Sequence, residues 1–293
     1  MRRGAMRTTV PAKKTTFSFF DYKWKKVPAW AKTTEEMYRQ WYLERYGYGT
    51  LSGLKKFLAD KENVLEAGCG LARDSKMFAE LNPNANIVAV DQSPSAIAVA
   101  HKTLKRFKNC RVVRGDITNF RRYDARFDFI SCDQVIHHTP SVERTLGHLL
   151  RKLKRGGILN FSVCRKKNKY RDFADDRIME WAATKSPEEI WQFAKIATEL
   201  GRALYELGID NVRFEGRTYP NLQRFIHNNV FRCWYDPTIN FALSVSSNYD
   251  WFSGNPRFNS KEIRAILGKL PPHKILRFHE DDATISVVLK KLY

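Results

Sequence analysis

A short apolar run that breaks into a glycine turn is the strongest folding signal in this chain. Val64–Ala67 is apolar apart from Glu66, and Gly68 and Gly70 follow it before a helical pattern begins. A buried strand that ends in such a turn lets backbone N–H groups and a helix N-terminus approach a ligand closely. A second apolar run ends in Asp91, about twenty residues beyond the glycines, where a nucleotide-binding unit places its ribose-binding carboxylate. The two runs predict a nucleotide-binding βαβ unit.

The alternation of short apolar runs with helical patterns continues along the chain and predicts its fold. Runs of the length of a buried strand occur at residues 64–67, 87–90, 111–113, 127–131 and 158–163. Helical patterns lie between them at residues 73–81, 94–107 and 142–153. This order is typical of an α/β protein with a doubly wound, mainly parallel sheet. Two closing strands, at 274–278 and 284–289, have only a short connection and predict an antiparallel hairpin at the edge of a seven-stranded sheet.

The alternation is interrupted between residues 165 and 259, where the chain is mostly helical and rich in aromatic residues. It resumes with a helix at residues 260–268. We therefore expect an N-terminal arm with helices (1–59) that closes over the ligand site, a core (60–164 and 260–293) and a helical lid inserted at 165–259. Within the arm, residues 1–16 are expected to be flexible and helices are expected at 34–46 and 51–59.

The composition restricts the surroundings and partners of the protein. No apolar run is long enough to cross a bilayer, and the basic start lacks the apolar core of a secretory signal, which favours a cytoplasmic location. The five cysteines are scattered without a Cys-x-x-Cys pair, which argues against a zinc site or a disulfide framework. The net charge of +20 favours anionic partners such as nucleic acid, phosphates or acidic lipid, although a solvated basic surface explains it equally well.

Further motifs follow the glycine turn in a characteristic order. They are Val88–Asp91, Gly115–Ile117, Phe127–Asp133 and Leu153–Gly157. In this order and spacing the chain resembles the class I S-adenosylmethionine-dependent methyltransferases, and more narrowly their small-molecule subgroup of the methyltransferase type 11 kind. The resemblance covers about residues 60–164 and resumes over 260–290. It implies a Rossmann-like fold and S-adenosylmethionine as the cofactor.

The resemblance also implies which residues bind the cofactor. The glycine turn and Glu66 would hold the methionine end, Asp91 the ribose hydroxyls, and Asp116 the adenine amino group. The full expected set is Glu66, Gly68, Gly70, Arg73, Asp91, Gln92, Asp116, Ile117, Cys132 and Asp133. Purely structural roles remain as alternatives, since the glycines can form a tight turn, Asp91 can cap the next helix, and Gly115–Asp116 is a common turn.

Candidate residues for the methyl acceptor come from two other places. His137 and His138 follow the fourth expected strand, where either could act as a general base for an acceptor that must lose a proton, or could simply pack against the next helix. In the insertion, a helix expected at residues 221–234 carries a polar stripe that could hold a phosphate or carboxylate, or could be a solvated face. The stripe consists of Arg224, His227, Asn228 and Arg232.

The sequence therefore predicts methyl transfer by direct displacement to a small-molecule, anionic acceptor, with oxygen or nitrogen as the methylated atom. The alternative is an RNA methyltransferase, acting on ribose or tRNA, that uses the basic surface. A non-catalytic cofactor-binding protein is disfavoured by the intact cofactor motifs. A nicotinamide-dependent oxidoreductase is rejected because Arg73 occupies the place of its third glycine. Neither the oligomeric state nor the identity of the acceptor follows from the sequence.

Overall fold

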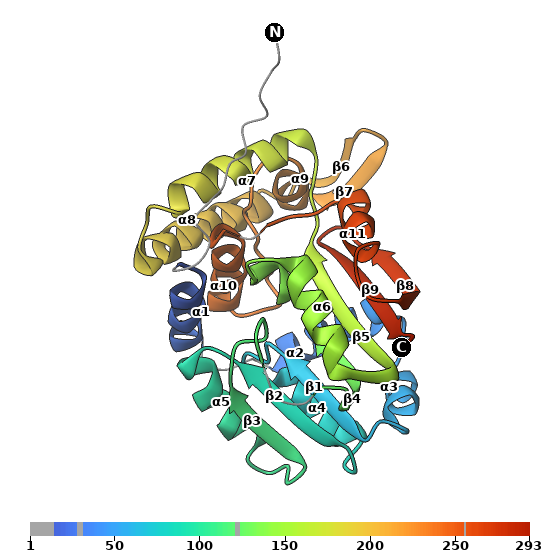
Figure 1. Ribbon diagram of the computed structural model, residues 1–293. Helices are drawn as coiled ribbons and strands as arrows, with labels where there is room; N and C mark the ends of the chain where they lie inside the picture. Colours follow the sequence, from blue (N-terminus) through green and yellow to red (C-terminus); the bar gives the residue numbers. More distant parts are fainter. Residues whose placement is uncertain (1–14, 28–31, 121–123, 255) are drawn as a thin grey trace.

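A seven-stranded sheet forms the centre of the protein (Figure 1). The computed structural model describes residues 15–27, 32–120, 124–254 and 256–293. The strand order is β3-β2-β1-β4-β5-β9-β8, in which β9 is antiparallel to both of its neighbours and β1–β5 are parallel. The strands are β1 (Asn63–Ala67), β2 (Asn86–Asp91), β3 (Cys110–Arg114), β4 (Phe127–Cys132), β5 (Leu153–Cys164), β8 (His273–Glu280) and β9 (Thr284–Lys291). The predicted α/β sheet with its C-terminal hairpin is confirmed.

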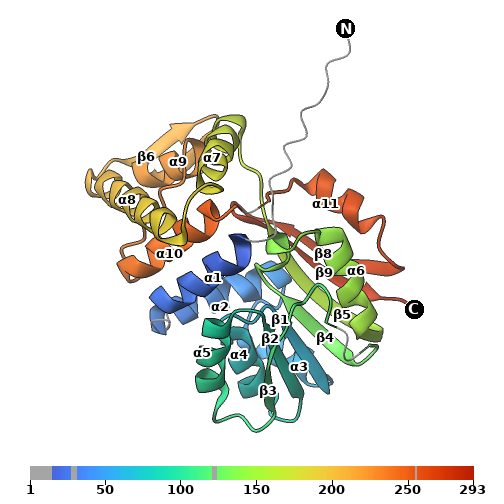
Figure 2. The same ribbon diagram turned by 60° about the vertical axis from the view of Figure 1, so that its left-hand side comes forward.

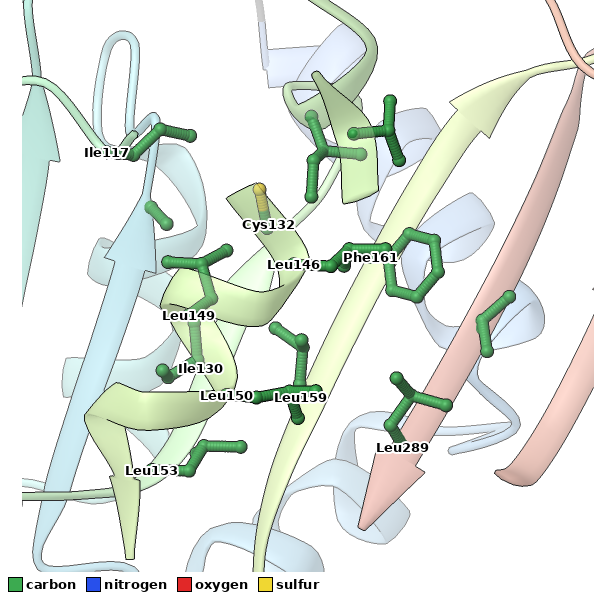
Figure 3. Close-up of a cluster of buried hydrophobic side chains, with 14 of the residues drawn as sticks. Ile117, Ile130, Cys132, Leu146, Leu149, Leu150, Leu153, Leu159, Phe161 and Leu289 are labelled. Carbon is green, nitrogen blue, oxygen red and sulfur yellow. The ribbon is translucent and has the colours of Figure 1, made fainter. Parts of the chain in front are cut away.

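Both faces of the sheet are buried, which explains why its parallel strands are almost continuously apolar. Successive strand residues face opposite sides, so Leu65 joins the cluster on one face and Val64 the cluster on the other. On the first face, Figure 3 shows Leu146 and Leu150 of α6 (Val142–Lys152) lying against strand residues such as Leu159. The helices that cover the sheet include α3 (Leu51–Leu58), α4 (Arg73–Leu81), α5 (Pro94–Leu104) and α11 (Ser260–Leu267).

The residues of the expected insertion lie beyond the carboxyl ends of the parallel strands (Figures 1 and 2). The chain leaves the sheet at Arg165 and returns at Phe258, and these two residues form a parallel β-bridge. Between them the helices enclose an apolar cluster of their own, which includes Ile190, Tyr249 and Phe252. The elements are α7 (Lys169–Ala182), α8 (Pro187–Glu206), the hairpin β6 (Asp210–Phe214) and β7 (Arg217–Asn221), α9 (Leu222–Asn229) and α10 (Phe241–Phe252).

The N-terminal helices connect these helices to the core. Helix α1 (Thr15–Lys26) lies between α5 and α10 in both ribbon views, and its Phe19 belongs to the apolar cluster of α8 and α10. Helix α2 (Lys32–Tyr46) packs against the other face of the sheet through Tyr42 and Tyr46. In the described part of the chain, no helix is both long and apolar enough to span a membrane.

Several local expectations differ from the structure, and in one case a tertiary contact explains the difference. The helix expected at 221–234 ends at Asn229, because Asn248 of α10 accepts hydrogen bonds from Arg232 and from the backbone of Trp234 and holds that segment outside the helix. The hairpin β6–β7 and helix α1 were not predicted, and α5 ends at Leu104 instead of residue 107. Of the arm expected to be flexible, residues 1–14 lie outside the described residues, and residues 15 and 16 begin α1.

Candidate active site

The glycine turn after β1 requires glycine for steric reasons. Gly68 has φ 83° and Gly70 φ 50°, a region of backbone conformation that other residues rarely adopt. A Cβ atom on Gly68 would lie 2.3 Å from Cγ1 of Val135, in the loop that follows β4. The backbone N–H groups of Gly68 and Cys69 both donate to the carbonyl of Val90, at 2.8 Å. The turn therefore packs tightly between the end of β2 and the loop that follows β4.

Asp91, the last residue of β2, joins this turn to the next helix. Its Oδ2 accepts a hydrogen bond from the Gly70 N–H at 2.9 Å, and its Oδ1 accepts one from the Ser93 N–H at 2.9 Å. Burial raises the pKa of Asp91, although these backbone bonds act in the opposite direction. Ser93 itself caps α5 through its hydroxyl, so capping that helix does not depend on Asp91.

The charged residues around the turn are bonded to one another. Glu66 accepts hydrogen bonds from the backbone and the hydroxyl of Ser75 in α4, and burial together with nearby Asp74 raises the pKa of Glu66. Arg73 pairs with Asp74 at 2.7 Å and lies 3.7 Å from the carboxylate of Asp133. The negative and positive side chains around the end of β1 therefore compensate one another in part.

A single cavity of about 1830 Å³ connects the glycine turn with the helices beyond the sheet. That volume exceeds the roughly 300–1,000 Å³ of a typical small-molecule site, which leaves room for a cofactor and a second ligand. The expected cofactor residues that line it are Glu66, Gly68, Gly70, Arg73, Asp91, Gln92, Asp116, Ile117 and Asp133. Cys132 is different, because it is fully buried in the apolar cluster of Figure 3 and is not among the described residues that line the cavity.

The two histidines both line the cavity, but their surroundings differ. His137 is 2% exposed, its Nε2 lies 3.3 Å from Sγ of Cys164, and burial lowers its pKa to about 4. His138 is partly exposed and its ring centroid lies 4.1 Å from that of His137 and 4.4 Å from that of Phe20 in α1. The protein therefore keeps His137 neutral at physiological pH.

The four residues of the expected acceptor stripe also line the cavity, although only three of them lie on α9. Arg224 stacks on Trp234 at 3.9 Å and pairs with Asp236 at 3.4 Å. Asn228 accepts a hydrogen bond from Lys167 at 3.3 Å. Arg232 reaches the cavity from the segment after α9.

Several cavity residues were missed at the level of the sequence. One of them is Lys23 of α1, which forms an ion pair with Asp250 of α10. Trp24 and Asp250 were expected to help close the pocket, and a Cβ on Gly70 would lie 3.0 Å from Trp24, so α1 directly covers the glycine turn. Lys167 belongs to a basic run that the sequence marks only as positive charge. Its position beside Asn228 depends on the path of the chain after β5, which no local pattern predicts.

Comparison with known proteins agrees with this geometry. A family model described as a methyltransferase domain matches residues 58–221, more than half of the chain. The chain belongs to the methyltransferase domain family. This membership confirms the family expected from the motifs, the S-adenosylmethionine-dependent methyltransferases, together with their cofactor, S-adenosylmethionine.

Individual relatives are distant. An uncharacterized protein of Synechococcus sp. is 33% identical over 35% of this chain and 25% of its own length. A trans-aconitate 2-methyltransferase of Deinococcus radiodurans is 25% identical over 47% of this chain and 50% of its own length. The matches thus span half or less of these relatives. Among solved structures, the N-methyltransferase NodS of Bradyrhizobium japonicum, in complex with S-adenosylhomocysteine, has a TM-score of 0.49 at 13% identity, with 94% of this chain and 98% of NodS covered.

Proposed function

We propose that this protein transfers the methyl group of S-adenosylmethionine, by direct displacement, to an oxygen or nitrogen atom of a small, anionic acceptor. The observation that carries this proposal is the cavity that joins the expected cofactor residues to the buried guanidinium of Arg232 in the expected insertion. Both line the same space of about 1830 Å³.

The cofactor fits the residues at the glycine turn. Gly68 has no room for a side chain beside Val135, so the backbone of the turn stays free of side chains at that point. Asp91 would accept hydrogen bonds from ribose hydroxyls, Asp116 would accept one from the adenine amino group, and Glu66 would face the methionine amine. When bound, S-adenosylmethionine supplies an electrophilic methyl group.

The chain's own part in the reaction is to position the acceptor and to exclude water. In a direct displacement, alignment of the two reactants supplies much of the rate acceleration. In the proposed division of the chain, residues 60–164 and 260–293 form the core, and the arm (1–59) and the insertion (165–259) cover the cavity. Where the acceptor must lose a proton, His138 is the favoured general base, because the lowered pKa of His137 makes that residue a weak base at neutral pH.

The location of Arg232 favours a small acceptor over RNA. Its side chain is only 8% exposed, whereas contacts to a nucleic-acid backbone require cations on an open surface. The name of one relative, trans-aconitate 2-methyltransferase, specifies a carboxylate acceptor. We place the protein in the cytoplasm, since the five cysteines are all free thiols, as expected in a reducing compartment.

The test uses S-adenosylmethionine with a tritiated methyl group and separates its products by size. The protein is incubated with the small-molecule fraction and, separately, with the RNA fraction of a bacterial extract. We expect tritium in small products that an anion exchanger retains. The matched control is Asp91→Asn, which should transfer far less label. Tritium in nuclease-sensitive RNA, with none in the small-molecule fraction, would refute the proposal.

A further inference from the structure

We propose that the acceptor carries at least two negative charges, and that Lys167, His227 and Arg232 bind them in the part of the cavity that the insertion lines. This inference rests on the proposed function and narrows its acceptor to dianions, such as dicarboxylates or phosphate monoesters. Lys167 was not predicted as a binding residue.

Arg232 is a buried cation whose hydrogen-bond partners are all neutral. Its Nε donates to Asn248 Oδ1 at 3.0 Å, and its Nη2 donates to the hydroxyl and the backbone carbonyl of Ser247 at 2.6 and 3.1 Å. These bonds hold the guanidinium rigidly over the ring of Trp251, at 4.9 Å. Burial and the neighbouring Arg171 lower the pKa of Arg232 to about 10. A preorganised cation of this kind is suited to an anion.

His227 adds a hydrogen-bond donor to the same site. Its Nε2 lies 3.5 Å from Nη1 of Arg232, and because arginine can only donate, Nε2 must accept. The neutral ring then carries its proton on Nδ1, which is buried and has no hydrogen-bond partner among the described residues. Burial and the positive charge of Arg232 lower the pKa of His227 well below its usual range, which keeps the ring neutral. An oxyanion would satisfy the unpartnered N–H.

Lys167 supplies the second positive charge. Its ammonium group donates to Asn228 Oδ1 at 3.3 Å and to the backbone carbonyl of Asp282, and neither contact neutralises it. Burial and Arg171, with smaller effects from Arg232 and Arg165, lower the pKa of Lys167 to about 8, although Asp282 acts in the opposite direction. Lys167 and Arg232 therefore repel each other until an anion binds.

Two of the nearby carboxylates are already paired with other cations. Asp175 binds both Arg171, at 2.9 Å, and Arg257, at 2.6 Å. Asp250 forms its ion pair with Lys23 of α1. Asp282 offsets part of the positive charge of Lys167, but among the residues whose structure is described neither Lys167 nor Arg232 forms an ion pair with a carboxylate, so both charges are only partly compensated. A dianion balances them.

The experiment measures the binding of simple anions by calorimetry to the full-length protein saturated with S-adenosylhomocysteine. The probes at pH 7 and constant ionic strength are succinate, which is a dianion at this pH, inorganic phosphate, which is partly dianionic, and acetate as the monoanion. We expect succinate or phosphate to bind at least tenfold more tightly than acetate. The stronger of the two identifies the acceptor group as a pair of carboxylates or a phosphate. Equal affinity for all three anions would overturn the inference.

Variants locate the site. Arg232→Gln should weaken binding of the dianion at least tenfold, whereas Arg202→Gln, on the exposed face of α8, should leave it unchanged. Lys167→Met provides a second test that does not require an intact Arg232. At pH 8 the wild-type protein should take up part of a proton when the dianion binds, since the anion raises the pKa of Lys167, and this uptake should vanish in the variant. A merely structural lysine would not give this signal, so undiminished proton uptake in Lys167→Met would also overturn the inference.

Failure of this inference is distinguishable from failure of the proposed function. If tritium enters small anionic products but the anion series shows no preference for dianions, only the charge of the acceptor has been misjudged. If RNA receives the label instead, the proposed function itself is refuted.

Discussion

Replacing Asp175 by asparagine should severely destabilise the helices beyond the sheet. Asp175 and Arg171 lie one turn apart on α7, both side chains are fully buried, and Arg171 Nε lies 2.9 Å from Asp175 Oδ1. On its other side, Asp175 Oδ2 lies 2.6 Å from Nη1 of Arg257. One carboxylate therefore compensates two guanidinium groups that have little access to water.

The magnitude follows from what remains after the substitution. Arg257 keeps its contacts to Asp172 and Asp176, but Arg171 loses its ion pair. Its Nη1 and Nη2 lack hydrogen-bond partners among the described residues and its side chain is fully buried, so no other described carboxylate pairs with the charge. Removing one partner of a buried pair costs about 3–5 kcal/mol, because an uncompensated buried charge remains. That is a large part of the roughly 5–15 kcal/mol that stabilises a typical domain.

Urea denaturation at pH 7, followed by circular dichroism, measures the change in the free energy of unfolding. The same helix supplies the control, since Arg177 and Glu180 form an ion pair at 2.9 Å with side chains that are 61% and 41% exposed. Glu180→Gln should change the free energy of unfolding by only about 0–1 kcal/mol. A loss below about 1 kcal/mol for Asp175→Asn, or a loss no greater than that of the control, would refute the electrostatic reasoning.

Three further predictions concern the cofactor site and its pH dependence. Asp91→Asn should weaken binding of S-adenosylhomocysteine about 10- to 100-fold in calorimetry, because hydrogen bonds to an ionised carboxylate contribute roughly 1.5–3 kcal/mol. Unchanged affinity would contradict the proposed role of Asp91 at the ribose. Gly68→Ala should abolish that binding, since the new Cβ would lie 2.3 Å from Val135, whereas Gly216→Ala, also at positive φ but with nothing within 4 Å, should not. The pKa of His137 is about 4 in the folded protein, so near pH 6.5 this side chain begins to bind a proton in the unfolded state but not in the native state. The free energy of unfolding should therefore fall between about pH 6.5 and 4 in the wild type, and His137→Gln should lack this part of the slope.

The sheet and the glycine turn could be predicted because their signals are local. The apolar run at Val64–Ala67 is buried on both faces of the sheet, so nearly every residue of it had to be apolar. The left-handed backbone at Gly68 and Gly70 excludes most side chains, and the carboxylate of Asp91 stands at the strand end that parallel pairing brings beside them. The turn directly follows its strand, and Asp91 ends the next strand of the same βαβ unit, so their geometry follows from backbone sterics and strand pairing.

The acceptor end of the cavity depends on contacts between distant segments. The four-residue spacing of Arg224, Asn228 and Arg232 favours one continuous helix, but Asn248 of α10 holds Arg232 outside it, through bonds that span 16 residues. Lys167 reaches Asn228 only because the chain turns out of β5 toward α9, 61 residues further on. A sequence pattern predicts only which side chains lie on the same face of one helix or strand. Lys167 and Arg232, neither of which forms an ion pair among the described residues, come from separate segments, so their proximity depends on the tertiary packing alone.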